Sequence, residues 1–346
     1  MATMKAAFWD GKEMRLKNHE RPDPGPGDVI VNIRATGICG SDLIVYYDKE
    51  SPEEIAAGHE IAGEIVAVGP DMDSNRVGER VALDSIGAGR ACTQCWYCRH
   101  GQYFLCANPV EERGGGFAEY MVLRATGCFA MQDNLSWAEG ALTEPLAVAV
   151  HAVRRGQLAG GETVAVLGSG TIGLACIAAA RALGAGKIIS TARYSQQVAM
   201  AKELGADDAV TPEGDVLQNA LAEITDGRGA DLTLEAVGGR SDDSLNQAIE
   251  VTRPQGRIST TGNFSRPVTV DWWKGLMKEQ SWIWSAVYGV LDGRHDYEVA
   301  LDLMASGRVN IGQVVTHTVL LNDIQKGIEI SYNKKDTGAI KVQVTQ

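Results

Sequence analysis

Residues 162–173 read ETVAVLGSGTIG, and this stretch decides the fold of the second half of the 346-residue chain. An apolar run typical of a buried strand ends at Leu167, and residues 172–183 have helical periodicity. Between them, three glycines follow the spacing of a dinucleotide-binding turn: the first makes the tight turn, the second admits a pyrophosphate, and the third lets helix approach strand. We therefore expect a dinucleotide to bind at the helix N-terminus, on Gly168, Ser169, Gly170, Thr171, Ile172 and Gly173.

Strand and helix patterns continue to alternate downstream of this turn. The expected strands are residues 187–191, 209–210, 231–235 and 256–260, and the expected helices are 196–204, 216–225 and 242–252. This order predicts a parallel sheet covered by helices on both faces. Upstream, as far as about residue 123, short apolar runs are broken by turn residues, which predicts strands, for example at 28–34, 62–68 and 80–83. We expect a helix at 143–155 between the two parts.

The segment after the second strand of the expected sheet, 190–195, reads STARYS and bears on the choice of dinucleotide. NAD-binding turns usually carry an acid about 20 residues after the glycines, which would repel the 2′-phosphate of NADP. Here Ala192 takes the place of the acid and Arg193 follows it. We therefore expect NADP, with NAD as the weaker alternative, and Ser190, Thr191 and Ser195 as possible hydrogen-bonding neighbours.

Four of the seven cysteines lie within fifteen residues, at Cys92, Cys95, Cys98 and Cys106. Four thiolates at this spacing form a closed tetrahedral shell without an open position for substrate, so the pattern predicts a structural zinc site. An iron–sulfur cluster accepts the same ligands, but no second cluster motif is present, which favours zinc.

Cys39, His59 and Glu60 are a second candidate metal site. A thiolate, an imidazole and a carboxylate make a three-ligand zinc site whose fourth position stays open to water or substrate. The sequence around them reads CGSD at 39–42 and GHEIAGEIVAVG at 58–69.

Length and composition indicate how many domains the protein has, which partners it binds and in which compartment it works. At roughly 150 residues per domain, 346 residues predict two domains. The formal net charge of −12 disfavours nucleic acid and anionic membranes as partners. No apolar stretch is long enough to span a membrane, and residues 1–5 do not begin the long apolar region of a signal peptide, so we expect a cytoplasmic protein. In that reducing compartment, an odd number of cysteines argues against a disulfide framework.

Taken together, CGSD, GHE-x2-G-x5-G, the four cysteines, GGFAEY at 115–120, TEPLA at 143–147 and GSGTIG resemble the zinc-dependent medium-chain alcohol dehydrogenase family. The resemblance implies an α/β protein in which a Rossmann domain, residues 151–290, interrupts a GroES-like β-barrel catalytic domain, residues 1–150 and 291–346. The structural zinc lobe would span about residues 90–110, and the active site would lie between the domains. The family commonly forms homodimers or homotetramers.

The resemblance also implies roles for single residues. Cys39, His59 and Glu60 would be the catalytic zinc ligands. Glu144 stands where the sorbitol dehydrogenase subgroup has Glu, and would hold the zinc-bound water or replace it on the metal. Ile44 stands where relatives commonly have a proton-relay histidine, so Ser41 is expected to accept the proton. The Arg-Tyr pair of sorbitol dehydrogenases matches best at 286–288, which keeps Tyr288.

We therefore expect reversible hydride transfer between NADP and a secondary alcohol, polyol or sugar carbon, with one catalytic and one structural zinc. A threonine dehydrogenase-like or sugar 1-dehydrogenase activity is the alternative within the enzyme class. A catalytically silent dinucleotide-binding protein is the alternative outside it. Four tryptophans at 272, 273, 282 and 284 are interpreted as core or subunit-interface packing rather than as a substrate pocket.

Overall fold

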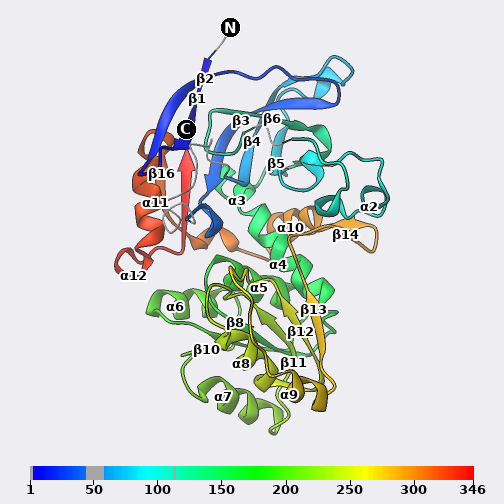
Figure 1. Cartoon of the computed structure of the whole chain (residues 1–346), viewed down its shortest axis with the longest axis vertical. Coiled ribbons are helices and arrows are strands. Elements are labelled where there is room, and N and C mark those ends of the chain that lie inside the picture. Colours follow the sequence, from blue (N-terminus) through cyan, green and yellow to red (C-terminus); the bar gives the residue numbers. More distant parts are fainter. Residues whose placement is uncertain (1–2, 44–57, 112–113) are drawn as a thin grey trace. The chain divides into compact units, whose positions relative to one another are not determined.

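A computed structural model describes residues 3–43, 58–111 and 114–346 of the chain. Its contacts divide the chain into two compact units (Figure 1). The first contains residues 1–144, 289–305 and 315–346, and the second contains 145–288 and 306–314. No helix in the described part of the chain is long and apolar enough to cross a membrane.

The first unit is built on a seven-stranded sheet. Strand order is β16-β17-β3-β4-β5-β7, with β6 paired to β3. The strands are β3 (Asp28–Gly37), β4 (Glu60–Val68), β5 (Arg80–Asp84), β6 (Tyr120–Arg124), β7 (Cys128–Ala130), β16 (Val315–Leu320) and β17 (Lys341–Thr345). Branched apolar residues such as Val31, Ile33 and Ile65 are fully buried along β3 and β4 and form its core.

Short elements surround this sheet. They are the hairpins β1 (Thr3–Trp9) with β2 (Met14–Glu20) and β14 (Val290–Leu291) with β15 (Arg294–His295), and the helices α2 (Trp96–Arg99), α3 (Trp137–Ala141), α10 (Asp296–Ala305), α11 (Ile324–Tyr332) and α12 (Lys334–Thr337). Helix α3 begins with a capping box, in which Ser136 and Glu139 each accept a bond from the other's amide. Helix α11 packs on β16 and β17 through Ile324 and Ile328.

The second unit holds a six-stranded parallel sheet, as the sequence predicts. Its order is β10-β9-β8-β11-β12-β13. The strands are β8 (Thr163–Leu167), β9 (Lys187–Thr191), β10 (Asp208–Val210), β11 (Ala230–Glu235), β12 (Thr252–Thr260) and β13 (Ser281–Trp284), and the helices are α5 (Thr171–Ala182), α6 (Ser195–Glu203), α7 (Val216–Thr225), α8 (Asp243–Val251) and α9 (Trp272–Met277). Helix α4 (Thr143–Arg155) begins with the last two residues of the first unit.

Two details differ from the sequence interpretation. The contacts group residues 145–150 and 306–314 with the second unit and residues 289–290 with the first. The 306–314 segment joins the second unit because residues 311–314 contact α5. The core interpretation is wrong for Trp272, Trp273 and Trp284, which are exposed, whereas Trp282 is half-buried and its indole N–H donates to the Thr260 hydroxyl. Trp284 lies on β13, the strand at one end of the sheet order.

Candidate functional site

Cys39, His59 and Glu60 are brought together by the antiparallel pairing of β3 with β4. Gly37, the last residue of β3, lies opposite Glu60, the first residue of β4. Cys39 follows β3 by two residues and His59 precedes β4 directly, so both meet at the same end of the pair. One ligand atom of each of the three side chains lies within 4.8 Å of the others. This is the group of residues that the sequence singled out, and we call it the open cluster.

Asp42 supports the open cluster, and the sequence analysis did not select it. Its Oδ2 accepts a hydrogen bond of 2.8 Å from the amide of Cys39, and its Oδ1 lies 3.9 Å from Nδ1 of His59. Burial raises the pKa of Asp42 to about 6, although the charge of His59 opposes this rise. Burial lowers the pKa of His59, but a hydrogen bond with Cys39 and the charges of Glu144 and Asp42 outweigh it and raise the value to about 10. A carboxylate behind a histidine orients the ring for metal binding.

Lys341 is the second residue that the sequence analysis missed. Its ammonium donates to Oε1 of Glu60 at 2.6 Å and to the carbonyl of Ile38 at 2.9 Å. Both charged side chains are buried, with exposures of 3% for Lys341 and 1% for Glu60. Burial lowers the pKa of Lys341, but the charges of Glu60 and Cys39 outweigh it and raise the pKa above its usual value.

The surroundings of Oε2, the second carboxylate oxygen of Glu60, show whether a metal ion fits the open cluster. Oε2 is buried and has no hydrogen-bond partner among the described residues. A buried carboxylate oxygen without a partner is costly, and a cation bound by the open cluster would satisfy it. Thiolate, imidazole and carboxylate together are ligands that suit zinc. The donor set therefore fits a zinc ion.

Glu144 and Ser41, two further catalytic candidates, belong to the same unit as the open cluster. Glu144 is buried in the first turn of α4 and does not belong to the open cluster. Burial raises the pKa of Glu144 to about 8, although the charge of His59 opposes this rise. Ser41 is exposed at the start of a 3-10 turn over Ser41–Leu43. Tyr288 is buried at the end of the second unit. Ile44 lies outside the described residues.

The four-cysteine lobe is compact, and its cysteines are free thiols. One sulfur atom from each of Cys92, Cys95, Cys98 and Cys106 lies within 4.8 Å of the others. The amide of Cys98 donates to Sγ of Cys95, and this bond contributes most to a pKa of about 6 for Cys95. Amide donors stabilise the thiolate form of cysteine, which is the form that binds metals. Four cysteine sulfurs held this close together therefore fit a closed zinc site.

The dinucleotide turn has the geometry that its glycines predict. Gly168 has a positive φ of 90°, a conformation that favours glycine. A Cβ on Gly173 would lie 1.8 Å from the carbonyl oxygen of Gly168, so only glycine lets α5 approach the strand there. A Cβ on Gly170 would meet nothing within 4 Å, which leaves open space beside the first turn of α5, where Thr171 and Ile172 lie. The hydroxyl of Ser169 points inward and donates to the carbonyl of Thr191.

The side chains after β9 differ in exposure. Arg193 is exposed and its guanidinium makes no hydrogen bond or ion pair with the described residues, while Ala192 is buried. Ser195 is exposed at the start of α6. Ser190 and Thr191 are buried, and the Thr191 hydroxyl accepts a bond from the amide of Gly168. Both hydroxyls are buried, and their place beside a bound dinucleotide stays a prediction.

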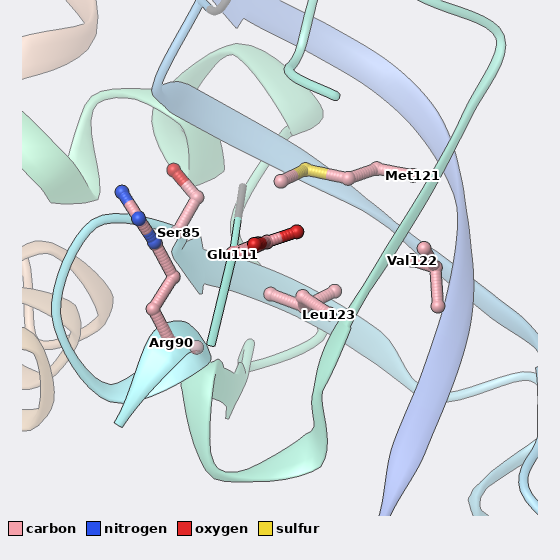
Figure 2. A pocket seen from close by; sticks show the side chains of 7 residues that line it. Ser85, Arg90, Glu111, Met121, Val122 and Leu123 are labelled. Carbon is pink, nitrogen blue, oxygen red and sulfur yellow. The ribbon is translucent and has the colours of Figure 1, made fainter. Parts of the chain in front are cut away.

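A separate pocket in the first unit is lined in part by Ser85, Arg90 and Glu111 (Figure 2). Its volume is about 10 Å³, which is close to the room that one water molecule needs. None of its lining residues belongs to the open cluster or to the four-cysteine lobe. This pocket is too small to hold a substrate.

Comparison with known proteins identifies the family. Residues 25–133 match the alcohol dehydrogenase GroES-like domain, and residues 171–306 match the zinc-binding dehydrogenase family. The chain is 35% identical over 336 residues to a probable D-xylulose reductase A of Arthroderma otae, with 91% of this chain and 90% of that protein covered. The chain belongs to the zinc-dependent medium-chain alcohol dehydrogenase family.

Other members place this dehydrogenase in the polyol branch. It is 33% identical to a sorbitol dehydrogenase of Bacillus subtilis, with 99% of this chain and 97% of that protein covered. It is also 36% identical to an L-threonine 3-dehydrogenase of Pyrococcus furiosus, with coverage of 86% and 85%. The chain is thus an oxidoreductase that acts on alcohols and uses zinc and a nicotinamide cofactor.

Solved structures of similar proteins include both forms of that cofactor. A zinc-binding dehydrogenase of Sinorhizobium meliloti bound to NADP has a TM-score of 0.85 and 27% identity, with full coverage of both chains. An alcohol dehydrogenase of Escherichia coli CFT073 complexed with NADH has a TM-score of 0.87 and 28% identity, also with full coverage. The choice between NAD and NADP must therefore be argued from this chain's own residues.

Proposed function

We propose that this dehydrogenase transfers a hydride between a secondary alcohol carbon of a polyol or sugar and NADP. One observation carries the proposal. A thiol, an imidazole and a buried carboxylate, one of whose oxygens has no partner among the described residues, meet within 4.8 Å in a chain that also carries a dinucleotide turn at Gly168. Together these features supply the two binding sites that alcohol oxidation needs, one for a metal ion and one for a nicotinamide cofactor.

The residues of the open cluster would share the work as follows. Cys39, His59 and Glu60 would hold a zinc ion, which when bound supplies Lewis-acid polarisation of the alcohol or carbonyl oxygen. Ser41, exposed two residues after Cys39, would accept the hydroxyl proton and release it to solvent. Glu144, buried beside His59 and Glu60, would exchange with water as a further oxygen ligand.

The four-cysteine lobe would hold a second zinc ion with a structural role. Its shell of four sulfurs leaves no position for a substrate. We therefore propose two zinc ions per chain, of which one is catalytic. A chain kept in the reducing cytoplasm would retain the thiols that both sites need.

The preference for NADP rests on Arg193. Its guanidinium is exposed and engages no described residue, so it is available to a 2′-phosphate. Ala192 offers no carboxylate that would repel that phosphate. The names of the relatives support a polyol, and the L-threonine 3-dehydrogenase among them makes L-threonine a second candidate substrate.

We further propose that the protein is a homodimer or homotetramer. Trp284 on the terminal strand β13 is 65% exposed, and Trp272 and Trp273 on α9 are 73% and 68% exposed. Large exposed aromatic side chains and an unpaired strand edge are typical of surfaces that associate. Sedimentation velocity of the parent and of Trp284→Lys tests this, and a monomeric parent contradicts it.

The function is tested by metal content and turnover together. We expect the parent to hold about two zinc ions per chain and to reduce NADP with a polyol, sugar or L-threonine from a substrate panel. Cys39→Ala and His59→Ala should lose the turnover and one zinc, yet bind NADPH normally by fluorescence, because the dinucleotide turn belongs to the other unit. Near-parental activity of either variant would show that the open cluster is not the catalytic site.

A further inference from the structure

The ammonium of Lys341 connects two of the three segments of the open cluster. It binds the carboxylate of Glu60 on β4 and the carbonyl of Ile38, which precedes Cys39. Lys341 is the first residue of β17, and β17 pairs with β3 along residues 343–345 and 35–37. The buried ammonium of Lys341, on a third strand, therefore bonds to Glu60 itself and to the residue that precedes Cys39.

We propose that Lys341 and Gly37 form a cradle that fixes Glu60 as a one-oxygen metal ligand beside Cys39 and His59. This inference rests on the function proposed above and assigns positioning roles to two residues outside the ligand set. Neither residue touches substrate or cofactor in this interpretation. Both act through the carboxylate of Glu60.

The two oxygens of Glu60 are in different situations. Oε1 is held by Lys341 at 2.6 Å, whereas Oε2 is buried and no described residue bonds to it. A free carboxylate can bind a metal through one oxygen or both, and can rotate between these modes. With Oε1 held by a buried ammonium, only Oε2 is available to a cation. The ion pair thus selects one binding mode.

Gly37 provides the space for this carboxylate. It lies opposite Glu60 in the β3–β4 register, and a Cβ built on it would lie 1.8 Å from Oε2 of Glu60. Gly37 is absent from the described residues with a positive φ, so its backbone does not require glycine. Glycine is needed here for room, because any side chain would displace Oε2, the oxygen that has no partner among the described residues.

The burial of the ion pair also argues for positioning. Removing two charges from water costs much of what their attraction returns, so a buried pair is a weak source of stability by itself. Groups that orient metal ligands, in contrast, commonly change metal affinity about 10- to 100-fold when they are removed. We therefore expect the main effect of Lys341 on the open metal site.

Three variants of the zinc-loaded protein test the cradle. Lys341→Met removes the ammonium, Gly37→Ala places a methyl group against Oε2, and Lys335→Met is the control, because Lys335 is exposed on α12. Zinc per chain is measured after titration with a graded chelator, and circular dichroism reports the fold. The four-cysteine lobe serves as an internal reference for each variant.

We expect Lys341→Met and Gly37→Ala to release the open-site zinc at about 10- to 100-fold lower chelator concentration, while the lobe zinc and the control stay as in the parent. Open-site affinity within about threefold of the parent in either folded variant overturns the proposal. Loss of both zinc ions together also overturns it, because it shows a general structural role. If Lys341→Met does not fold, Gly37→Ala decides alone, since it removes neither of the two charged side chains.

The same measurements separate this inference from the proposed function. A parent with only the lobe zinc would remove the proposed function itself. A parent with two zinc ions and variants of unchanged affinity would leave the function in place and reject the cradle.

Discussion

The amide of Gly168 donates a hydrogen bond to the hydroxyl of Thr191, 2.8 Å away. Gly168 is the first glycine of the dinucleotide turn, and Thr191 is the last residue of the neighbouring strand β9. The carbonyl of Thr191 in turn accepts a bond from the hydroxyl of Ser169. The turn expected to receive the pyrophosphate is thus fixed to the end of the strand that precedes Arg193.

Thr191→Val should therefore weaken dinucleotide binding without unfolding the sheet. The change keeps the shape but leaves the half-buried Gly168 amide without its acceptor, which costs about 1 kcal/mol. We expect roughly tenfold weaker binding of NADPH by fluorescence titration. Thr269→Val is the control, because Thr269 is exposed. Equal affinity in Thr191→Val and the parent would show that the turn holds its shape without this bond.

The four-cysteine lobe gives a prediction about stability. Cys98 is the buried member of the set, and its amide and thiol both contact Cys95. Because binding of a structural zinc contributes directly to folding, Cys98→Ser should lower the melting temperature by several degrees and disturb assembly more than it changes kcat. Cys128→Ser, outside the lobe, is the comparison. Unchanged melting and quaternary state would argue against a structural zinc.

The fold and most of the candidate site could be predicted from the sequence because their patterns are local. The turn at Gly168 and the spacing of the four cysteines each lie within fifteen residues. For the open cluster the sequence offers the three residue types, and the family resemblance adds their ligand roles, since Cys39 and His59 are brought together only by the pairing of β3 with β4.

The partners that were missed depend on tertiary structure. Lys341 and Glu60 are 281 residues apart, and nothing in the sequence near Lys341 indicates a buried ion pair. Asp42 had a local indication, because an Asp three residues after Cys39 can accept the Cys39 amide in a turn. The inward direction of the Ser190 and Thr191 side chains follows from their depth in β9, which a sequence motif does not report.

Asp207 gives a prediction about pH in the dinucleotide unit. Burial opposes the ionised form of Asp207, but Lys187, the amide of Ile188 and Arg181 outweigh it and lower the pKa of Asp207 below its usual 3.8. A carboxyl group whose pKa is lower in the folded state stabilises the fold above pH 3.8, and this contribution is lost as the pH falls through the folded-state pKa.

Asp207→Asn should therefore lower stability at pH 7, by about 1 to 2 kcal/mol, and the difference from the parent should shrink as the pH falls below about 4. Thermal unfolding at a series of pH values measures both. Glu223→Gln serves as the control, because Glu223 is an exposed acid of the same unit. A difference that does not change with pH would mean that the lost charge is not its cause.

The choice of dinucleotide gives the last prediction. A 2′-phosphate carries nearly two negative charges, and an arginine meets it with a planar set of donors. The exposed Arg193 should favour NADP over NAD by roughly 1.5 to 3 kcal/mol, or about ten- to a hundredfold in kcat/KM. Ala192 adds to the preference because it removes the carboxylate that repels the phosphate. The double variant Ala192→Asp with Arg193→Leu supplies a ribose-hydroxyl acceptor and removes the cation, so it should reverse the preference. The measurement is kcat/KM for both dinucleotides in the parent and in the double variant. A parent that prefers NAD, or a variant that still favours NADP tenfold, would show that the 2′-phosphate binds elsewhere.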